Sequence, residues 1–266
     1  MIAYRATLDV PVHTLLRVTA WLTQHRRRIG TPKGSRRASC RTQALLVLRW
    51  FREGAPMRVL ARDAGLPIST AYRYLHEAIT VLAEHAPDLH EVPEQGRREA
   101  WSHVSLDGTL IETDRVAART EAGNDLWYSG KHKKHGGNIQ VVCDPTGFPV
   151  WTSPVEPGST HDITAARAHA LPALYRAAAH GLPTLTDKGY TGAGLGAHVP
   201  VKGHALDPDT ATRNMLINAV RAVAERGNAI LKIRWPALQR IHLCPHRIGD
   251  ITAAALVLST LERGSR

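Results

Sequence analysis

Three carboxylates after residue 100 of the sequence have no simple structural explanation. Asp107 lies inside the apolar segment 104–111, which predicts a strand, and an acid within a central strand is costly unless it is paired or binds a metal. Asp187 directly follows a short strand expected at 184–186, and ligand sites form where the strands of α/β sheets end. Magnesium prefers oxygen ligands, and two ions about 4 Å apart can activate an attacking oxygen and stabilise a leaving one in phosphoryl transfer. We therefore predict that Asp107, Asp187 and Glu225 are catalytic and hold two Mg²⁺ ions, for which Mn²⁺ can substitute.

The long helix expected over residues 209–233 carries Glu225 on a polar stripe. Counted from Asn214, the polar residues fall at +4, +7, +11, +14 and +18, which places them on one face. A solvated helix surface gives the same pattern, so spacing alone leaves both interpretations open. If the stripe faces a metal site, Arg221 and Lys232 can offset phosphate charge, with Asn218 beside them as a further accessory residue. The stripe consists of Asn214, Asn218, Arg221, Glu225, Asn228 and Lys232. The opposite face, expected to pack on the sheet, consists of Leu216, Val220, Val223 and Ile230.

Asp162 has two interpretations of about equal weight. It follows the segment Gly158–His161 at the start of a helix expected over residues 162–179, where an acidic side chain can cap the helix N-terminus. It can equally take part in chemistry. We therefore treat Asp162 as an accessory residue of the predicted site.

The elements around these acids indicate an α/β fold. Three strands joined by short connections predict an antiparallel meander, and helices alternate with two shorter strands after it. This order is that of a ribonuclease-H-like mixed sheet flanked by helices, although other mixed α/β folds share it. The expected strands are 104–111, 137–143, 148–155, 184–186 and 199–201, and the expected helices are 162–179, 209–233 and 250–262.

The first part of the sequence predicts an all-α domain with a helix-turn-helix at about 57–85. A short helix over 57–64 is followed by a turn at Gly65 and by a helix over 70–85 that begins after Ser69, a favourable N-cap. The exposed residues at the start of the second helix would reach DNA, although any helical hairpin gives a similar pattern. These residues are Ser69, Thr70, Tyr72 and Arg73. Two further helices are expected upstream, over 12–28 and 41–52.

Charge favours a nucleic-acid partner. The formal net charge is +11, and the interval between Asp9 and Glu53 holds ten basic residues and no acidic one. Such a segment attracts phosphate polymers; a solubilising surface or contact with acidic lipid are the alternatives, and the adjacent helix-turn-helix favours double-stranded DNA. The basic segment 127–135 also suits DNA, unless it is only an exposed loop. The expected contacts are Arg26, Arg27, Arg28, Arg36 and Arg37 in the first segment and Lys131, Lys133 and Lys134 in the second.

Composition also predicts the domain division and the cellular compartment of the protein. The stretch 87–98, rich in Pro, Glu and Gln, predicts a division into residues 1–95 and 96–266. No apolar run is long enough to span a membrane, and no secretory signal is evident. Three widely spaced cysteines suit a reducing compartment. We expect a cytoplasmic protein associated with the bacterial nucleoid, with no membrane partner and no nucleotide cofactor.

Four segments in order resemble the DDE transposases of bacterial insertion sequences, in the branch related to the eukaryotic Harbinger elements. The resemblance covers most of residues 100–245. It implies a ribonuclease-H-like fold, a triad of Asp107, Asp187 and Glu225, and preference for Asp187 over Asp162 as the second acid. Asn218 stands where many relatives have a tyrosine. The segments are Asp107–Thr109, Pro157–Ile163, Asp187–Tyr190 and the helix around Glu225.

The resemblance also implies a reaction and an assembly. Relatives cut DNA at the terminal repeats of their element, and the freed 3′ hydroxyl attacks target DNA. They generally act in pairs, so we expect a homodimer on DNA. Two alternatives remain at this point: a transposase-derived DNA-binding regulator without catalysis, and a metal-dependent DNA endonuclease that cuts but does not join.

Overall fold

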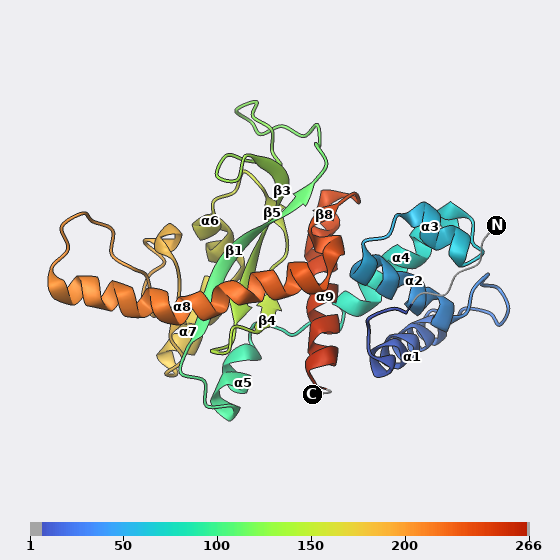
Figure 1. The fold of residues 1–266 in the computed structure, drawn as a ribbon, viewed down its shortest axis with the longest axis horizontal. Helices are drawn as coiled ribbons and strands as arrows, with labels where there is room; N and C mark the ends of the chain where they lie inside the picture. The colour runs from blue at the N-terminus through green and yellow to red at the C-terminus, as the bar shows by residue number, and fades with distance from the viewer. Residues whose placement is uncertain (1–6, 265–266) are drawn as a thin grey trace.

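A computed structural model of the chain describes residues 7–264, except for the side chains of residues 224–226. Within that range one mixed sheet forms the centre of the molecule (Figure 1). The long strand β1 pairs antiparallel with β3 on one side and parallel with β6 on the other. The antiparallel meander expected from the sequence is therefore present, since β4 also pairs antiparallel with β3. The strands are β1 (Val104–Thr113), β2 (Tyr128–Ser129), β3 (Lys134–Cys143), β4 (Pro149–Thr152), β5 (Glu156–Pro157), β6 (Thr184–Leu185), β7 (Ala197–His198) and β8 (Arg240–Ile241).

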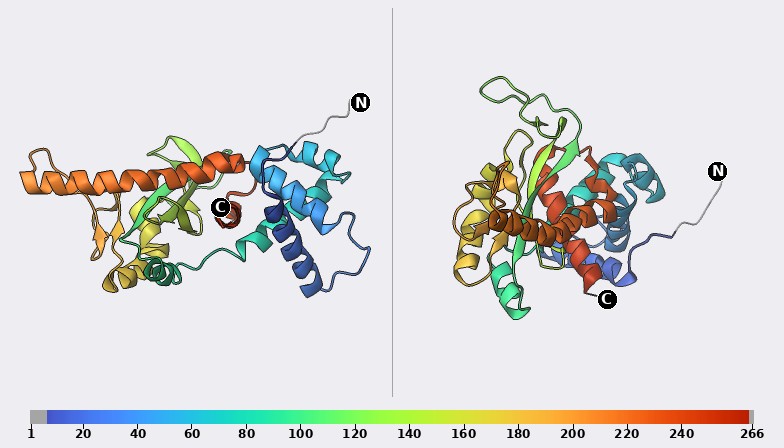
Figure 2. Two further views of the ribbon diagram at one scale, coloured as in Figure 1. Left: turned by 60° about the horizontal axis from the view of Figure 1, so that its bottom comes forward. Right: turned by 60° about the vertical axis from the view of Figure 1, so that its left-hand side comes forward.

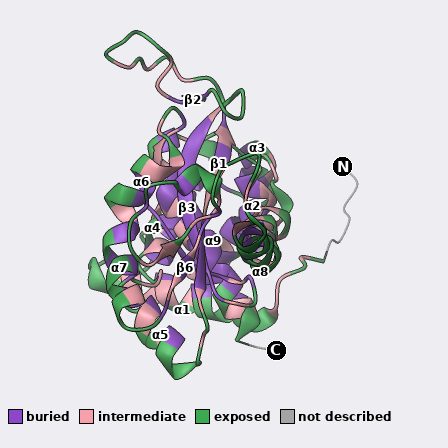
Figure 3. Ribbon diagram, turned by 90° about the vertical axis from the view of Figure 1, so that its left-hand side faces the viewer, coloured by how far each residue is buried: buried purple, intermediate pink, exposed green. Residues whose placement is uncertain are grey.

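Helices cover both faces of the sheet because its strands alternate two apolar sets of side chains. Leu106 and Val142 point to one face, where they pack with residues of α6 and α7. Val141 and Ile139 point to the other face, where they pack with residues of α8 and α9. The central strands are buried on both sides (Figure 3). These helices are α6 (Asp162–His169), α7 (Leu171–Ala179), α8 (Pro208–Arg234) and α9 (Ile248–Arg263).

The N-terminal helices pack against α9 and continue the same apolar core (Figures 1 and 2). Phe51 of α2 is fully buried, and its ring meets the ring of Trp235 edge-on at 6.1 Å between centroids. Ser39 caps α2 by accepting a hydrogen bond from the Thr42 backbone N–H, and Gly54 ends it in the left-handed conformation. These helices are α1 (Val12–Arg28), α2 (Cys40–Glu53), α3 (Met57–Asp63) and α4 (Ile68–Ala83).

The helix-turn-helix geometry is present in α3 and α4, but its second helix begins earlier than expected. Gly65 makes the turn with φ of +64°. Pro67 occupies the N-cap position of α4 and no side chain caps the helix. The prediction that Ser69 is the N-cap is therefore wrong: Pro67 has the extended backbone that precedes a helix, and Ser69 lies in the first turn.

A short helix, α5 (Val92–Arg98), lies within the stretch 87–98. Two further expectations need correction. The helix expected over 162–179 is two helices, because the backbone breaks at Ala170 and Pro172 begins the second one. The strand expected at 199–201 is β7, which lies slightly earlier, at Ala197–His198.

The apolar face expected on α8 packs on the sheet only in part. Helix α8 has 27 residues, and its N-terminal half runs past the sheet (Figure 1). Leu216 and Val220 are therefore exposed, at 57% and 41%. Among the described residues, no helix is long and apolar enough to cross a membrane.

Candidate functional site

The structure brings Asp107 and Asp187 together where β1 and β6 run parallel to one another. Val104 of β1 pairs with Thr184 of β6; Asp107 lies three residues further along β1, and Asp187 lies two residues after Leu185, at which β6 ends. Asp107 is partly buried, and burial together with the charge of Asp187 raises its pKa to about 6. Two predicted catalytic acids therefore lie close enough to repel one another.

Asp107 is also held by the helix that crosses the sheet. The Asn228 side-chain amide donates a hydrogen bond of 2.9 Å to Asp107 Oδ2. The positive charge of Arg221, a buried residue of α8, opposes the rise in the pKa of Asp107. Both α8 residues belong to the predicted polar stripe, so this part of the stripe faces β1 and is not simply a solvated surface.

Asp187 ends the strand on a short turn. Its Oδ1 accepts a hydrogen bond of 2.8 Å from the Gly189 backbone N–H, as the cap of the 3₁₀ turn η1 (Lys188–Tyr190). One carboxylate oxygen therefore fixes the turn. The other oxygen has no hydrogen-bonding partner among the described residues.

Asp162 is the third acid that the structure places at this site. It is the first residue of α6, and His161 occupies the N-cap position with no side-chain cap. The capping interpretation of Asp162 is therefore wrong: its carboxylate points toward the sheet and packs over Gly108, next to Asp107. A Cβ atom at Gly108 would lie 2.5 Å from Asp162 Oδ1.

Glu225 lies on α8 between Arg221 and Asn228, the two residues that act on Asp107. The spacing of four and three residues places position 225 on the same face of the helix. Its side chain lies outside the described residues, so its role stays a prediction.

Comparison with known families decides what kind of protein carries this site. The family described as DDE superfamily endonuclease matches residues 106–260, a segment that contains all of these acids. The chain belongs to this family. Comparison with curated proteins and with solved structures gives no significant match. The predicted fold, a helical region followed by a ribonuclease-H-like mixed sheet with helices, is confirmed.

The predicted accessory residues Lys232 and Asn218 lie in different surroundings. The Lys232 ammonium donates hydrogen bonds to Thr109 Oγ1 and to the Leu110 carbonyl, so it fastens α8 to β1. Burial lowers the pKa of Lys232, and the charges of Glu112 and Asp107 oppose that change. Asn218 is exposed on α8 and, among the described residues, contacts none of the acids.

Oxygen atoms dominate the donor set, which suits Mg²⁺. Besides the two aspartates, Asn228 Oδ1 is buried and without a hydrogen-bonding partner among the described residues. A buried polar atom of this kind is costly unless a ligand or water satisfies it. Among the described residues, no three His, Cys, Asp or Glu side chains lie close enough to hold an ion by themselves. The oxygen ligands of the site therefore suit a divalent ion. A complete coordination shell needs a further ligand besides these residues.

Sequence reasoning missed two buried polar residues of β3. Asn138 and Gln140 are 6% and 0% exposed, and both lie on the side of Asp162. Two amides at alternate positions, followed by the apolar residues 141–143 of β3, were the available signal, because alternate residues of a strand share one face.

The start of α4 presents part of the predicted DNA-reading set. Ser69, Tyr72 and Arg73 are exposed. Thr70, which was expected to be exposed, is only 7% exposed, because it lies one helical turn before the buried Tyr74 on the face that packs against the core. The exposed face of the helix is therefore narrower than predicted.

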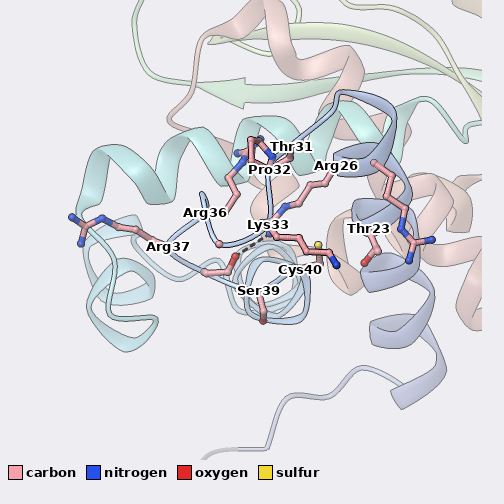
Figure 4. A pocket seen from close by; sticks show the side chains of 12 residues that line it. Thr23, Arg26, Thr31, Pro32, Lys33, Arg36, Arg37, Ser39 and Cys40 are labelled. Atoms are coloured by element: carbon pink, nitrogen blue, oxygen red, sulfur yellow. Dashed lines mark hydrogen bonds between the residues drawn. The ribbon is translucent and has the colours of Figure 1, made fainter.

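The basic segment forms a cationic cavity between the end of α1, the following loop and the start of α2 (Figure 4). Its volume is about 330 Å³, and no acidic residue lines it. Arg26 and Arg36 are held by protein groups, namely Gln43 and Glu77. Lys33 and the two exposed arginines, Arg27 and Arg37, also line it and have no partner among the described residues.

The other predicted DNA contacts form ion pairs in the structure or stay exposed. Arg28 pairs with Glu84 at 2.8 Å. Lys134 pairs with Glu112, and Lys131 pairs with Asp162 at 2.8 Å. Lys133 is exposed.

Proposed function

We propose that this DDE endonuclease is a DNA transposase that cleaves the ends of an insertion element and joins them to target DNA. The observation that carries the proposal is the proximity of Asp107 on β1 to Asp187 just after β6, inside the segment that matches the family. The ordered motifs that resemble bacterial insertion-sequence transposases support the finer assignment.

In the proposed site Asp107, Asp187 and Glu225 hold two Mg²⁺ ions, or Mn²⁺ in their place. Bound ions of this kind activate the attacking oxygen and stabilise the leaving oxygen of a phosphodiester. The positive charge of Arg221 favours the ionised form of Asp107, and the hydrogen bond from Asn228 orients Asp107 Oδ2. Lys232 keeps α8 in contact with β1, which sets where position 225 lies along the strand.

The proposed partners are the terminal repeats of the element and the target DNA. The exposed start of α4 suits base or phosphate contacts, and the cationic cavity beside it suits the phosphate backbone. We further propose that two copies act together on two DNA ends, in the bacterial cytoplasm at the nucleoid, without a nucleotide cofactor. In this assignment residues 1–95 bind DNA and residues 96–266 perform the chemistry.

The family description favours one alternative, an endonuclease that cuts DNA without joining it. The same metal site would serve both reactions, since cutting and joining are both phosphodiester exchanges. A regulator that binds DNA without chemistry is a weaker alternative. DNA binding alone does not explain why Asp107 and Asp187 lie close enough to repel one another.

A cleavage and strand-transfer assay tests the proposal. The substrate is labelled DNA from either side of the protein's own reading frame, with a supercoiled plasmid as target and Mg²⁺ as the ion. We expect end cleavage and joined products with the wild type, and neither with Asp107→Ala, Asp187→Ala or Glu225→Ala. The matched control is Asp209→Ala, which removes an exposed acid from the first turn of α8. Cleavage without joined products would favour the endonuclease, and cleavage that persists in the three variants would reject the site.

A further inference from the structure

A chain of hydrogen bonds runs from a buried tyrosine to Asp162. The Tyr190 hydroxyl donates to Gln140 Oε1 at 2.6 Å. Gln140 Nε2 donates to Asn138 Oδ1 at 2.9 Å, and Asn138 Nδ2 donates to Asp162 Oδ1 at 2.8 Å. Burial, with a smaller effect of the nearby acids, raises the pKa of Tyr190 well above its ordinary value, so the tyrosine keeps its proton and acts as the donor. Every hydrogen bond of the chain then has one donor-to-acceptor direction, and the last acceptor is the Asp162 carboxylate.

This chain is built into the core. Tyr190 and Gln140 are fully buried, and burying polar side chains is costly unless each one is hydrogen-bonded. The absence of a side chain at Gly108 leaves the space in which Asp162 and Gln140 approach β1. The hydrogen bonds of this buried network offset the cost of burying its polar groups, and they hold the Asp162 carboxylate in one position.

The fixed carboxylate holds one flexible cation. Asp162 Oδ2 accepts a hydrogen bond of 2.8 Å from the Lys131 ammonium. The Lys131 side chain is 61% exposed, whereas that of Asp162 is 15% exposed. An ammonium has three donors, and Lys131 uses one of them among the described residues, so two remain for a ligand. A cavity of about 240 Å³ lies beside the pair and is lined by both residues together with His132 and Asn138.

We propose that Lys131 contacts a DNA phosphate next to the scissile bond, and that Asp162 is the residue that positions it. The inference rests on the proposed function, because it takes DNA as the substrate. Both oxygens of Asp162 already accept hydrogen bonds, from Asn138 and Lys131, whereas Asp187 keeps one oxygen without a partner among the described residues. Asp162 is thus arranged to orient a cation of the chain, and Asp187 is arranged to take a ligand.

The neighbouring charges explain why a cation is needed at this place. Lys131 lies in the field of Asp107, Asp162 and Asp187. These carboxylates repel a phosphate backbone, and an ammonium between them and the DNA reduces that repulsion. Lysine binds phosphate as a point charge, without the fixed geometry of a guanidinium. The hydrogen bond to Asp162 therefore sets the direction from which the Lys131 ammonium meets the phosphate.

Binding measurements test the phosphate contact separately from the chemistry. The probes are the labelled end fragment and a random duplex of equal length, with Ca²⁺ in place of Mg²⁺. We expect Lys131→Ala to weaken binding of both duplexes alike, and to lower the salt dependence of binding by about one phosphate contact. Lys131→Arg should keep most of that salt dependence. The control Lys202→Ala removes an exposed lysine from the loop before α8 and should leave the salt dependence unchanged. A Lys131→Ala variant with the salt dependence of the wild type would overturn the proposal.

Two further measurements test the positioning role of Asp162. In an Asp162→Asn background the loss caused by Lys131→Ala should become smaller, because the lysine is no longer held; an equal loss in both backgrounds would overturn the role. The Mg²⁺ concentration that half-saturates thermal stabilisation should stay unchanged in Asp162→Asn and rise in Asp187→Asn. A rise in Asp162→Asn as large as that in Asp187→Asn would make Asp162 a metal ligand and reject the inference. Failure of the wild type to cleave DNA would count against the proposed function and leave these binding results intact.

Discussion

Replacing Asp107 by asparagine should stabilise the metal-free protein. Burial and the charge of Asp187 raise the pKa of Asp107 from its ordinary value of 3.8 to about 6. The folded state therefore binds more protons than the unfolded state between these two values, and the free energy of unfolding falls as the pH rises through this window. With about 1.4 kcal/mol for each unit of pKa, the ionised carboxylate costs roughly 3 kcal/mol above pH 6. The amide that replaces the carboxylate carries no charge, and its oxygen can still accept the hydrogen bond from Asn228.

Urea denaturation in EDTA measures this effect. We expect Asp107→Asn to raise the free energy of unfolding by roughly 3 kcal/mol at pH 8, and by much less at pH 4.5, where Asp107 is mostly protonated in the folded state. The control Asp209→Asn removes an exposed acid and should show no such pH dependence. Addition of Mg²⁺ should stabilise the wild type more than Asp107→Asn, because an ion at the site offsets the repulsion only where the charge exists. A variant that is no more stable than the wild type at pH 8 would refute the electrostatic account of the site.

Three further predictions follow from the packing and the charges. Gly108→Ala should abolish cleavage while the protein stays folded by circular dichroism, because the added Cβ would lie 2.5 Å from Asp162 Oδ1 and displace that carboxylate; full activity would show that the close contact is unimportant. Phe51→Ala should lower the free energy of unfolding by about 3–5 kcal/mol in urea titrations, since the side chain is fully buried where α2 meets Trp235, and a loss below 1 kcal/mol would contradict this packing. Arg27→Ala combined with Arg37→Ala should lower the salt dependence of DNA binding by about two phosphate contacts, measured by fluorescence anisotropy, and an unchanged dependence would exclude the cationic cavity as a DNA contact.

The sequence was sufficient to predict the pairing of Asp107 with Asp187. One acid interrupts an apolar strand and the other follows one, and the ends of parallel strands meet at one edge of a sheet. The position of Arg221 and Asn228 on one face of α8 was also predictable, because helical periodicity alone places them on one stripe; their contacts with Asp107 were not predicted. Such patterns depend only on the spacing of residues along the chain, which can be read directly from the sequence.

The remaining features depend on contacts between distant segments. Capping and chemistry predict the same residue type at Asp162, and only the direction of its side chain toward Asn138 distinguishes them. The exposure of Leu216 depends on how far α8 extends beyond the sheet, which the helical period does not contain. Thr70 is buried because it lies one helical turn before the buried Tyr74, so the buried face of α4 is wider than the apolar residues alone predict.

Iron-directed cleavage of the protein tests most directly whether the three acids surround one divalent metal site. Fe²⁺ accepts oxygen ligands and can replace Mg²⁺, and with ascorbate and peroxide it cuts the polypeptide near the place where it is bound. The protein alone is sufficient for the experiment, and mass spectrometry identifies the cut positions. The account predicts cuts near residues 107, 187 and 225 that Mg²⁺ suppresses and that Asp107→Ala abolishes. Cuts near 107 and 187 without any near 225, or cuts that Mg²⁺ does not suppress, would contradict it.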